Sequence, residues 1–287
     1  MRYTNNHDLP GPVVAALTRG DSQSVEGLRI TTLIDSPRIS QLKKAHRDEL
    51  VEDVADLAYR ALGSAVHLMF EQASSSNSGI SEERLNAEVE GTLISGAIDY
   101  QYEDGGAVAI TDYKTTSVFA VMMGDKPEWE RQLNCYAMLI RKSKNLPVKR
   151  LSIVAILRDW RASEAERRGD YPSTPIVSIP IALWPDEEQD RYVSERVRLH
   201  NLAETEMELG SLRPCTDEER WARPAKWAVH KGNNKRAMRL FDSEEEANLF
   251  KKNGEDRRVI KRAASYLRCE KYCPVAAWCD QNQRGDL

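Results

Sequence analysis

The sequence predicts a mixed α/β core in one large domain, followed by a C-terminal extension held together by cysteines. Segments with helical spacing of apolar residues alternate with short apolar runs typical of strands, in the order helix, strands, helix, strand. The chain has 287 residues, 41% of them hydrophobic, which is enough to bury a full core. Three of the five cysteines fall within the last twenty residues.

The first half of the chain is expected to begin with an irregular arm over 1–35, which leads into a strand at 28–34. Apolar spacing over 38–72 predicts two helices that break near Gly63, and the SSSNSG stretch at 74–79 predicts a loop. Strands are expected at 84–91, 92–102 and 107–114, with a turn at EDGG between the last two. These three strands form a meander.

The second half begins with a predicted helix over 129–143 and a buried strand over 148–160. A strand interrupted by prolines and a long polar helix follow within 163–206. Beyond them we expect a hairpin over 227–241, and a helix over 242–252 that Ser243 and Glu246 open at capping-box spacing. The predicted organisation is an N-terminal arm (1–35), a core (36–210) and a cysteine-stapled region (211–287).

The charge balance and the termini limit the function classes. The formal net charge is −4, so a nucleic-acid partner requires a local basic surface rather than a polycationic chain. No apolar run is long enough to span a bilayer, and the first residues lack a signal-peptide pattern, so we expect a cytoplasmic protein. In that reducing compartment, clustered cysteines indicate a metal site or catalysis rather than disulfides.

Three charged residues lie on predicted strands where burial is costly. Asp112 and Lys114 are two apart and therefore share one face of a strand, and a hairpin brings Asp99 close to them on the neighbouring strand. Oxygen ligands of this kind suit Mg²⁺ or Mn²⁺, and a nearby lysine can hold a water or balance phosphate charge. The alternative is a plain salt bridge on a half-exposed face.

Other candidates lie on flanking elements. His67 lies on a predicted helix, and the alternative for it is a satisfied core or surface histidine. Glu88 lies on the strand before Asp99. Gln132 and Tyr136 are four apart on one helical face, where the alternative is ordinary packing with a surface amide.

Four short motifs occur in order: G-x-x-x-H at 63–67, G-x-I-D at 96–99, D-Y-K-T at 112–115 and Q-L-x-x-Y at 132–136. In this order and spacing they resemble the PD-(D/E)XK nuclease superfamily, and within it the RecB-like and Cas4-like branch. The resemblance covers roughly residues 30–160. It implies a restriction-endonuclease-like mixed sheet flanked by helices, and a metal-dependent phosphodiesterase that acts on DNA.

The resemblance also implies roles for these residues. Asp99 and Asp112 would be the main carboxylate ligands of the metal, and Lys114 would orient or activate the attacking water. Gln132 and Tyr136 would contact DNA or brace Lys114 at the edge of the site. Additional ligands would be His67, the backbone carbonyl of Tyr113 and, less securely, Glu88.

The cysteines predict a second metal centre. Cys269, Cys273 and Cys279 form a C-x3-C-x5-C pattern, and Cys215 is a candidate fourth ligand. Four thiolates suit either a [4Fe-4S] cluster or a structural Zn²⁺, and the third alternative is a set of free buried thiols. Resemblance to the iron–sulfur staple of RecB-like and Cas4-like nucleases favours the cluster, although the first cysteine of the Cas4 pattern precedes the nuclease motifs. Cys135, within the 129–143 helix, is expected to be a core residue.

The predicted hairpin carries cations that could grip a phosphate backbone: Lys231, Lys235, Arg236 and Arg239. The alternative is an ordinary solvated hairpin. The segment before the cysteine triplet resembles nucleases of tailed bacteriophages and prophages, which implies a role in phage DNA recombination or processing.

The whole pattern therefore predicts a Mg²⁺- or Mn²⁺-dependent DNA nuclease, an exonuclease in the first instance. Without a helicase motif, such an enzyme would need a free end or a single strand supplied by a partner, such as a recombinase or a single-strand-binding protein. Two alternatives stay open: an endonuclease or junction resolvase that uses the same site, and a non-catalytic DNA-binding protein with a structural metal.

Overall fold

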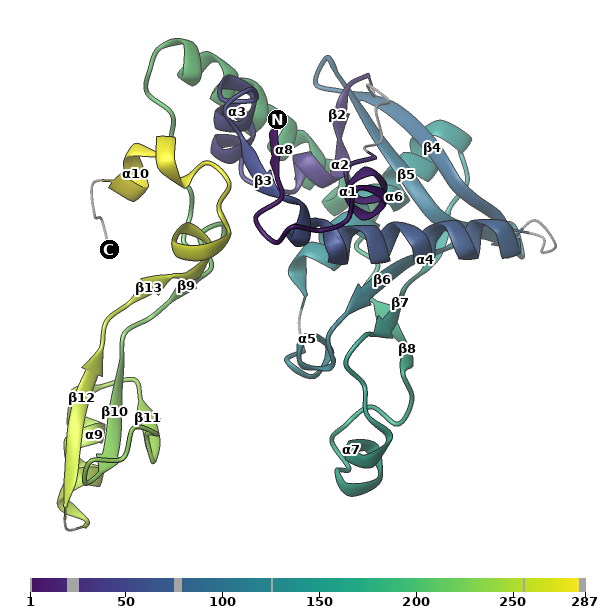
Figure 1. Ribbon diagram of the computed structural model, residues 1–287. Coiled ribbons are helices and arrows are strands. Elements are labelled where there is room, and N and C mark those ends of the chain that lie inside the picture. Colours follow the sequence, from purple (N-terminus) through teal and green to yellow (C-terminus); the bar gives the residue numbers. More distant parts are fainter. Residues whose placement is uncertain (1, 20–25, 75–78, 125, 255, 284–287) are drawn as a thin grey trace. The chain divides into compact units, whose positions relative to one another are not determined.

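The computed structural model describes residues 2–19, 26–74, 79–124, 126–254 and 256–283 (Figure 1). The chain divides into two compact units. Unit 1 comprises residues 1–37 and 48–208, and unit 2 comprises residues 38–47 and 209–287. Each unit is described by itself below.

Unit 1 is built on a six-stranded mixed sheet in the order β2-β5-β6-β7-β8, with β4 also paired to β5. The pairs β2–β5 and β6–β7 are parallel, and the pairs β4–β5, β5–β6 and β7–β8 are antiparallel. The strands are β2 (Leu28–Arg29), β4 (Ile80–Val89), β5 (Thr92–Asp104), β6 (Ala107–Thr116), β7 (Val148–Leu157) and β8 (Ile176–Ile181).

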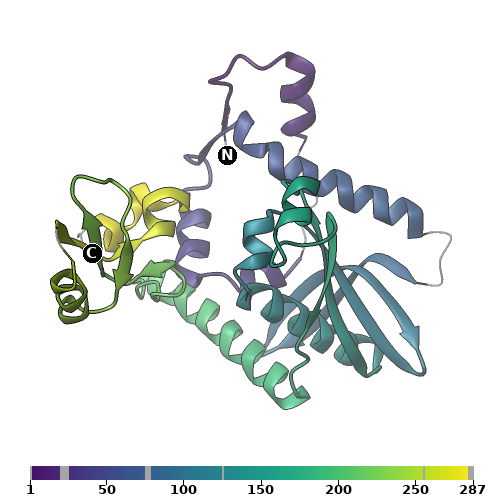
Figure 2. The ribbon, with the colours of Figure 1, turned by 90° about the horizontal axis from the view of Figure 1, so that it is seen from below.

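Helices cover both faces of this sheet. α4 (Ala58–Ser74) contacts β4 and β6, while α6 (Pro127–Lys144) contacts β4, β5, β6 and β7 and is packed in turn against α8 (Asp186–Glu208). In Figure 2, α4 and α8 lie on opposite sides of the strands. A mixed sheet flanked by helices is the predicted fold class, which is confirmed.

The core lies between the sheet and α6. Nine successive residues of α6, 132–140, are buried because the sheet covers one side of the helix and α8 the other. Their partners on the strands include Ile94, Ile98, Ile110 and Ile153, each fully buried. Burying side chains of this size contributes about 1.5–3 kcal/mol each. The core therefore holds β5 and β6 firmly in place.

The segment 28–34 was predicted to be a strand, and this is largely wrong. Only β2 (Leu28–Arg29) is extended, and α2 (Ile30–Leu33) follows at once. Ile30 and Leu33, three residues apart, are both buried, and that spacing matches one helical turn. Burial of these two side chains outweighs the β propensity of the intervening threonines.

The expected helix break near Gly63 is also wrong, because Gly63 lies inside α4. The first helix, α3 (Pro37–Ala45), ends earlier, and β3 (Val51–Asp53) and a 3₁₀ turn, η1 (Val54–Leu57), precede α4. The Asp53 side chain caps η1 by accepting a hydrogen bond from the backbone N–H of Ala55.

The N-terminal arm is more regular than expected. It contains β1 (Arg2–Thr4), which pairs in parallel with β3, and α1 (Gly11–Leu17), which buries no residue. The sequence also did not predict two shorter helices of unit 1, α5 (Val118–Met122) and α7 (Ala162–Arg167).

Unit 2 contains two small sheets. β9 (Ala222–Arg223) pairs with β13 (Ser265–Tyr266), and a three-stranded antiparallel sheet has the order β11-β10-β12. Its strands are β10 (Lys226–Lys231), β11 (Arg239–Phe241) and β12 (Arg257–Arg262), with α9 (Glu244–Lys252) packed on them. The predicted hairpin and helix are thus confirmed, and Ser243 accepts the expected capping bond from Glu246 N at 3.2 Å.

The end of the chain carries a π-helical turn, η2 (Arg268–Tyr272), a 3₁₀ turn, η3 (Ala276–Trp278), and α10 (Asp280–Gln283). α3 belongs to this unit apart from its first residue, and His46, just after α3, stacks on Trp278 with ring centroids 4.5 Å apart. Across the described residues of the whole chain, no helix is both long and apolar enough to cross a membrane.

Candidate active site

The candidate site lies where two strands of the main sheet part. β5 and β6 pair from Asp104–Ala107 as far as Tyr100–Thr111, and beyond this point β6 continues in parallel pairing with β7, Asp112 opposite Ile153. Asp99 and Asp112 are the next residues after the last β5–β6 pair. Both are buried, with 7% and 1% of their surface exposed. Two carboxylates therefore occupy the parting of the strands.

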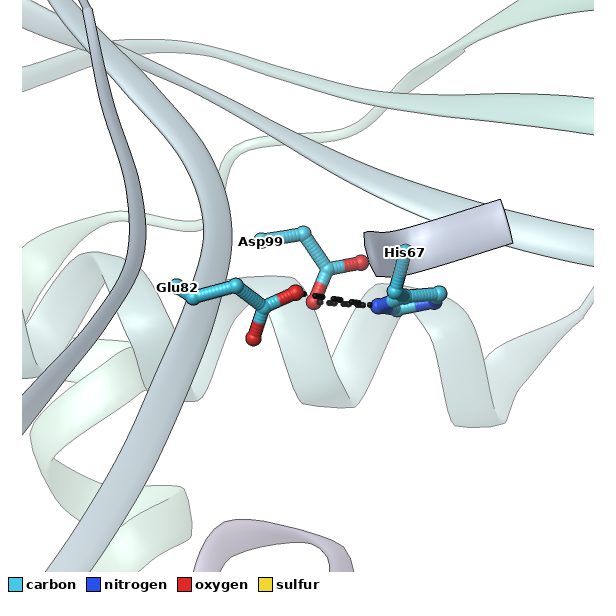
Figure 3. A group of neighbouring side chains, drawn as sticks. All are labelled: His67, Glu82 and Asp99. Atoms are coloured by element: carbon cyan, nitrogen blue, oxygen red, sulfur yellow. Dashed lines mark hydrogen bonds and ion pairs between the residues drawn. The ribbon is translucent and has the colours of Figure 1, made fainter. Parts of the chain in front are cut away.

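His67 of α4, Glu82 of β4 and Asp99 of β5 converge beside this point (Figure 3). Nδ1 of His67 lies 3.2 Å from Oε1 of Glu82 and 3.6 Å from Oδ1 of Asp99. One ligand atom from each residue falls within 4.8 Å of the others. The three elements thus bring one nitrogen and two carboxylates to one spot.

The backbone of Tyr113 holds two of these side chains in place. Its N–H donates to Oδ2 of Asp99 at 2.7 Å, and its carbonyl lies 3.1 Å from Nε2 of His67. A carbonyl oxygen can only accept, so Nε2 carries the proton and Nδ1 faces the carboxylates. The Tyr113 ring packs against Phe70 of α4, with ring centroids 4.5 Å apart, which holds the helix to the strand.

Asp112 is held from the other side of the sheet. Gln132 of α6 donates through Nε2 to Oδ1 of Asp112 at 3.1 Å and approaches the hydroxyl of Tyr136 at 2.9 Å. Nζ of Lys114 lies 2.6 Å from Oδ2 of Asp112 as an ion pair. The geometry of that pair is not that of a hydrogen bond, and Oδ2 accepts none from the described residues.

Gly96 explains why one residue of the G-x-I-D motif is a glycine. A Cβ at this position would lie 2.7 Å from Cε1 of Tyr136 and 3.0 Å from Cδ1 of Leu139. The absence of a side chain leaves room for the Tyr136 ring of α6 against β5, and the Tyr136 hydroxyl accepts a hydrogen bond from Gln132 on the same helix. The motif glycine thus supports the residue that holds Asp112.

The electrostatics of the site are those of crowded, buried carboxylates. Burial, and then the charge of Asp112, raises the pKa of Asp99 to about 7. The hydrogen bond to Glu82 and the charge of Asp99 raise the pKa of His67 despite its burial. Burial also raises the pKa of Tyr136. Negative charge at this position is costly unless a cation balances it.

The structure brings together most of the predicted residues: His67, Asp99, Asp112, Tyr113, Lys114, Gln132 and Tyr136. It does not bring Glu88 there. Glu88 is exposed and pairs with Leu93, near the far end of the β4–β5 hairpin. It lies six residues from Glu82 along the same strand, which corresponds to about 20 Å.

Glu82 was missed, although the hairpin contains a signal for it. The turn between Val89 and Thr92 has two residues, Glu90 and Gly91, both with positive φ (50° and 70°), as in a type I′ turn. Counting back from this turn sets Glu82 opposite Asp99. Glu82 also has a φ of 52°, a left-handed conformation that few non-glycine residues adopt.

The residues present fit a hard divalent cation. The donors are one imidazole nitrogen and carboxylate oxygens, a set that suits Mg²⁺ or Mn²⁺. Oδ2 of Asp112 is a buried oxygen whose neighbour is the Lys114 ammonium at 2.6 Å, and a carboxylate oxygen has a further lone pair that can bind a cation. The backbone carbonyl of Tyr113, which the resemblance implied as a further ligand, lies 3.1 Å from Nε2 of His67.

The four predicted cysteine ligands line one cavity in unit 2: Cys215, Cys269, Cys273 and Cys279. All four are free thiols. Burial raises the pKa of Cys273, and the neighbouring thiols Cys269 and Cys279 raise it further. Cys135 is buried in α6 of unit 1, where burial raises its pKa to about 12, so it is the core residue expected from the sequence.

Arg38 of α3 is the charged wall of this cavity. Its side chain is 3% exposed, and its Nε lies 3.3 Å from the sulfur of Cys279. Nη1 donates to the carbonyls of Leu212 (2.7 Å) and Arg213 (3.1 Å), and Nη2 forms an ion pair with Asp280. One guanidinium therefore ties the chain just before Cys215 to the chain around Cys279.

The predicted DNA-binding cations of the hairpin differ in their surroundings. Lys231, Lys235 and Arg236 are exposed. Arg239 lies over the rings of Phe241 and Phe250, at 5.0 Å and 5.9 Å from their centroids. Its charge is therefore partly engaged within unit 2.

Comparison with known proteins agrees with the fold class. The model of the PD-(D/E)XK nuclease superfamily matches residues 81–280, and the chain belongs to that superfamily. It is therefore a hydrolase of the nuclease class, whose members typically use divalent metal ions, and the class implies a DNA substrate.

The solved structures that resemble the chain include the two that follow, and the comparison with curated proteins found no match. SSO0001 is 17% identical over 66% of this chain and 85% of its own, with a TM-score of 0.45. A candidate exonuclease from Eubacterium rectale is 15% identical over 62% of this chain and 65% of its own, with a TM-score of 0.28.

Proposed function

We propose that this protein is a divalent-metal-dependent DNA exonuclease whose active site lies at the parting of β5 and β6. The observation that carries the proposal is the convergence of His67, Glu82 and Asp99 beside Asp112 and its partner Lys114. Buried carboxylates in such number destabilise a fold unless they serve a cation, and a phosphodiesterase needs one.

His67, Glu82, Asp99 and Asp112 are the residues that would hold the metal. Bound there, a Mg²⁺ or Mn²⁺ ion would lower the pKa of a water and offset the charge that develops on the phosphate. The backbone of Tyr113 fixes both His67 and Asp99, so the donor set is already oriented by the strand.

Lys114 is the positively charged side chain beside the metal ligands. It is 26% exposed, so its ammonium group can meet substrate while its ion pair with Asp112 fixes its position. There it orients the attacking water and balances phosphate charge. Gln132 and Tyr136 act indirectly, because Gln132 holds the Asp112 carboxylate and Tyr136 supports Gln132.

The test uses end-labelled linear single- and double-stranded DNA beside closed circles, with Mg²⁺, Mn²⁺ or EDTA. Parent protein is compared with Asp112→Ala and with the control Asp104→Ala, which changes an exposed aspartate on β5. Metal-dependent loss of linear DNA alone, absent in Asp112→Ala, is the expected result. Cutting of circles would identify an endonuclease or junction resolvase, and equal binding without cutting would identify a DNA-binding protein.

The wider context extends the same proposal. The order of the four motifs supports the RecB-like and Cas4-like branch, and the resemblance of the C-terminal segment supports a role in phage DNA recombination or processing. In that setting a recombinase or single-strand-binding protein would supply or receive the strand. The proposed organisation keeps an N-terminal arm (1–35), a nuclease core (36–210) and a stapled region (211–287).

We further propose that the four cysteines of unit 2 hold a [4Fe-4S] cluster rather than zinc. Cys269, Cys273 and Cys279 have C-x3-C-x5-C spacing, which is looser than the paired C-x2-C spacing common in zinc sites. Together with Cys215 they line one cavity, so four thiolate ligands are available to one group. The resemblance to the iron–sulfur staple of RecB-like and Cas4-like nucleases supports the cluster.

Anaerobic purification followed by iron, sulfide and zinc quantification tests this assignment. The cluster predicts iron and sulfide in equal amounts, lost in Cys273→Ala and kept in Cys135→Ala, the matched cysteine outside the cavity. One zinc per chain without iron would instead identify a structural zinc site.

A further inference from the structure

The C-terminal sheet carries a positive charge that the rest of the chain does not share. Residues 226–262 contain eleven lysines and arginines against six aspartates and glutamates, within a chain of net charge −4. A local excess of this size in an acidic protein marks a surface for a polyanion.

Several of these cations are already engaged within the sheet. Lys226 forms an ion pair with Asp242, and Lys261 lies over the ring of Trp227 at 5.5 Å from its centroid. Arg257 lies over Phe250, at 4.5 Å from the ring centroid, and donates to the Phe250 carbonyl. These contacts fasten β10, β11 and β12 to one another and to α9.

Three others have no such partner. Lys251 and Lys252, in the last turn of α9, and Arg258 of β12 are exposed, and none of their side chains has an ion-pair or hydrogen-bond partner among the residues that the structure describes. They line one open hollow together with Arg257. Two amide side chains, Asn233 and Asn248, and one carboxylate, Asp256, complete its polar wall.

The backbone around the hollow is closely built. Gly232 donates through its N–H to the carbonyl of Asp256 at 2.7 Å, and a Cβ on Gly232 would lie 2.8 Å from Oδ2 of Asp256. This contact brings the tip of the β10–β11 connection against the start of β12. Asp256 is thereby held at the Gly232 side of the hollow, which leaves the four cations in excess.

The chemistry of this wall selects the ligand. Four cations and two amides against one carboxylate offer many hydrogen-bond donors and a net positive charge, but no apolar anchor. Among the described lining residues there is one carboxylate, whereas a catalytic metal needs several grouped together. A group with several anionic oxygens is the matching occupant, and phosphate is that group in a nucleic acid.

We propose that this hollow, lined by Lys251, Lys252, Arg257 and Arg258, binds a backbone phosphate of the DNA substrate as a site separate from the catalytic one. The inference rests on the proposed nuclease function for the identity of the polyanion. Because the contacts would be to phosphate, the site contributes affinity without base preference. The exposed hairpin residues Lys231, Lys235 and Arg236 would extend it along the strand.

The test is DNA binding by the double variant Lys252→Glu/Arg258→Glu. Fluorescence anisotropy with a labelled oligonucleotide in EDTA, at several salt concentrations, gives affinity without cleavage. The matched control is Arg262→Glu, an exposed arginine on the same strand that does not line the hollow. Thermal unfolding checks that each variant keeps its fold.

We expect the double variant to bind DNA at least tenfold more weakly and to lower the slope of log affinity against log salt by about two, roughly one for each lost phosphate contact. Hydrolysis of the small substrate thymidine 5′-monophosphate p-nitrophenyl ester should be unchanged, because it is too short to reach a second site. If Arg262→Glu weakened DNA binding as much as the double variant does, the hollow would not be a discrete binding site.

The outcomes also separate this inference from the proposed function. If the parent cleaves DNA and the double variant binds it as tightly as the parent, the inference is wrong and the nuclease assignment stands. If the parent cleaves no DNA but binds it more tightly than the double variant does, the phosphate site stands and the nuclease assignment fails. The proposal would also be contradicted if the parent bound inorganic phosphate, the double variant did not, and both bound DNA with the same affinity.

Discussion

Glu82 of β4 and Asp99 of β5 are the two residues between the registered pairs Ser81–Tyr100 and Glu83–Ile98, and one ligand atom from each lies within 4.8 Å of the other. At this point the backbone of Glu82 turns into the left-handed region, and its carboxylate meets the Nδ1 atom of His67. A non-glycine residue in that conformation carries a cost, which is often found where function requires a particular side chain.

Replacing Glu82 should therefore remove activity, and replacing Glu88 should not. Mutating a residue that hydrogen-bonds to a metal ligand typically lowers metal affinity or activity about 10–100-fold. Mutating a ligand itself should therefore lower metal affinity or rate at least about 100-fold. Glu88→Ala is the matched control, because it removes an exposed glutamate from the same strand. Calorimetric titration with Mn²⁺ and DNA hydrolysis measure both. Equal activity of the two variants would exclude Glu82 as a ligand.

Gly96→Ala should destabilise unit 1. The new methyl group would lie 2.7 Å from the Tyr136 ring, and neither β5 nor α6 can withdraw without opening the core. Overpacking of this kind costs about 1–3 kcal/mol. Urea unfolding measures the change, and an unaltered midpoint would show that α6 can shift to accept the methyl group.

Gly63→Ala should have the opposite effect. Gly63 lies inside α4, and a Cβ there would lie 3.5 Å from Oγ1 of Thr115, an ordinary contact distance. Alanine is favoured over glycine in a helix by roughly 0.8–1 kcal/mol, so the variant should unfold at higher urea concentration. The two motif glycines therefore give a paired test of stability, because close packing requires a glycine at Gly96 and not at Gly63. A lower midpoint in Gly63→Ala would mean that α4 requires closer contact with β6.

Asp99→Asn should stabilise the metal-free protein while abolishing its response to metal. Asp99 is buried beside the like charge of Asp112, so removing its charge at pH 8 in EDTA should raise stability by roughly 1–3 kcal/mol. Added Mn²⁺ should raise the melting temperature of the parent, because the ion binds only the folded state, and leave the variant unchanged. Asp104→Asn, an exposed site on β5, serves as the control and should behave like the parent.

Arg38→Gln should weaken unit 2. The variant loses hydrogen bonds from a buried charge to two carbonyls and the contact with Cys279, a loss of roughly 2–3 kcal/mol. Thermal unfolding should show a lower transition, and the iron content expected for the proposed cluster should fall. Arg262→Gln, at an exposed position of the same unit, should change neither quantity. Full iron content and an unchanged transition in Arg38→Gln would show that the cavity does not depend on this guanidinium.

Much of the site could be predicted because local periodicity determines it. Asp112 and Lys114 share a face through the two-residue period of a strand, and Gln132 and Tyr136 share one through the four-residue spacing of a helix. Those relationships hold within one element, so the sequence alone contains them. The mixed sheet followed from the same periodicities.

Relationships between elements were harder to predict. Glu88 was named and Glu82 was not, because the predicted strand began at residue 84, whereas β4 begins at Ile80 and its register beyond the Glu90–Gly91 turn brings Glu82 near Asp99. The helix at Ile30–Leu33 depends on burial against other elements, which outweighs strand propensity. The role of Arg38 depends on contacts 174 to 242 residues away, which no local pattern records.

The composition of unit 2 has a consequence for the order in which the protein is made. Residues 38–47 belong with 209–287, so α3 leaves the ribosome long before the chain that covers it. At about 5–20 residues per second, roughly 10–45 s pass between α3 and Cys269. Throughout that interval Ile39 and Leu42 lack the C-terminal partners that later bury them. A chain that stopped near residue 208 would keep that apolar face permanently uncovered, so the C-terminal region cannot be removed as a simple appendage.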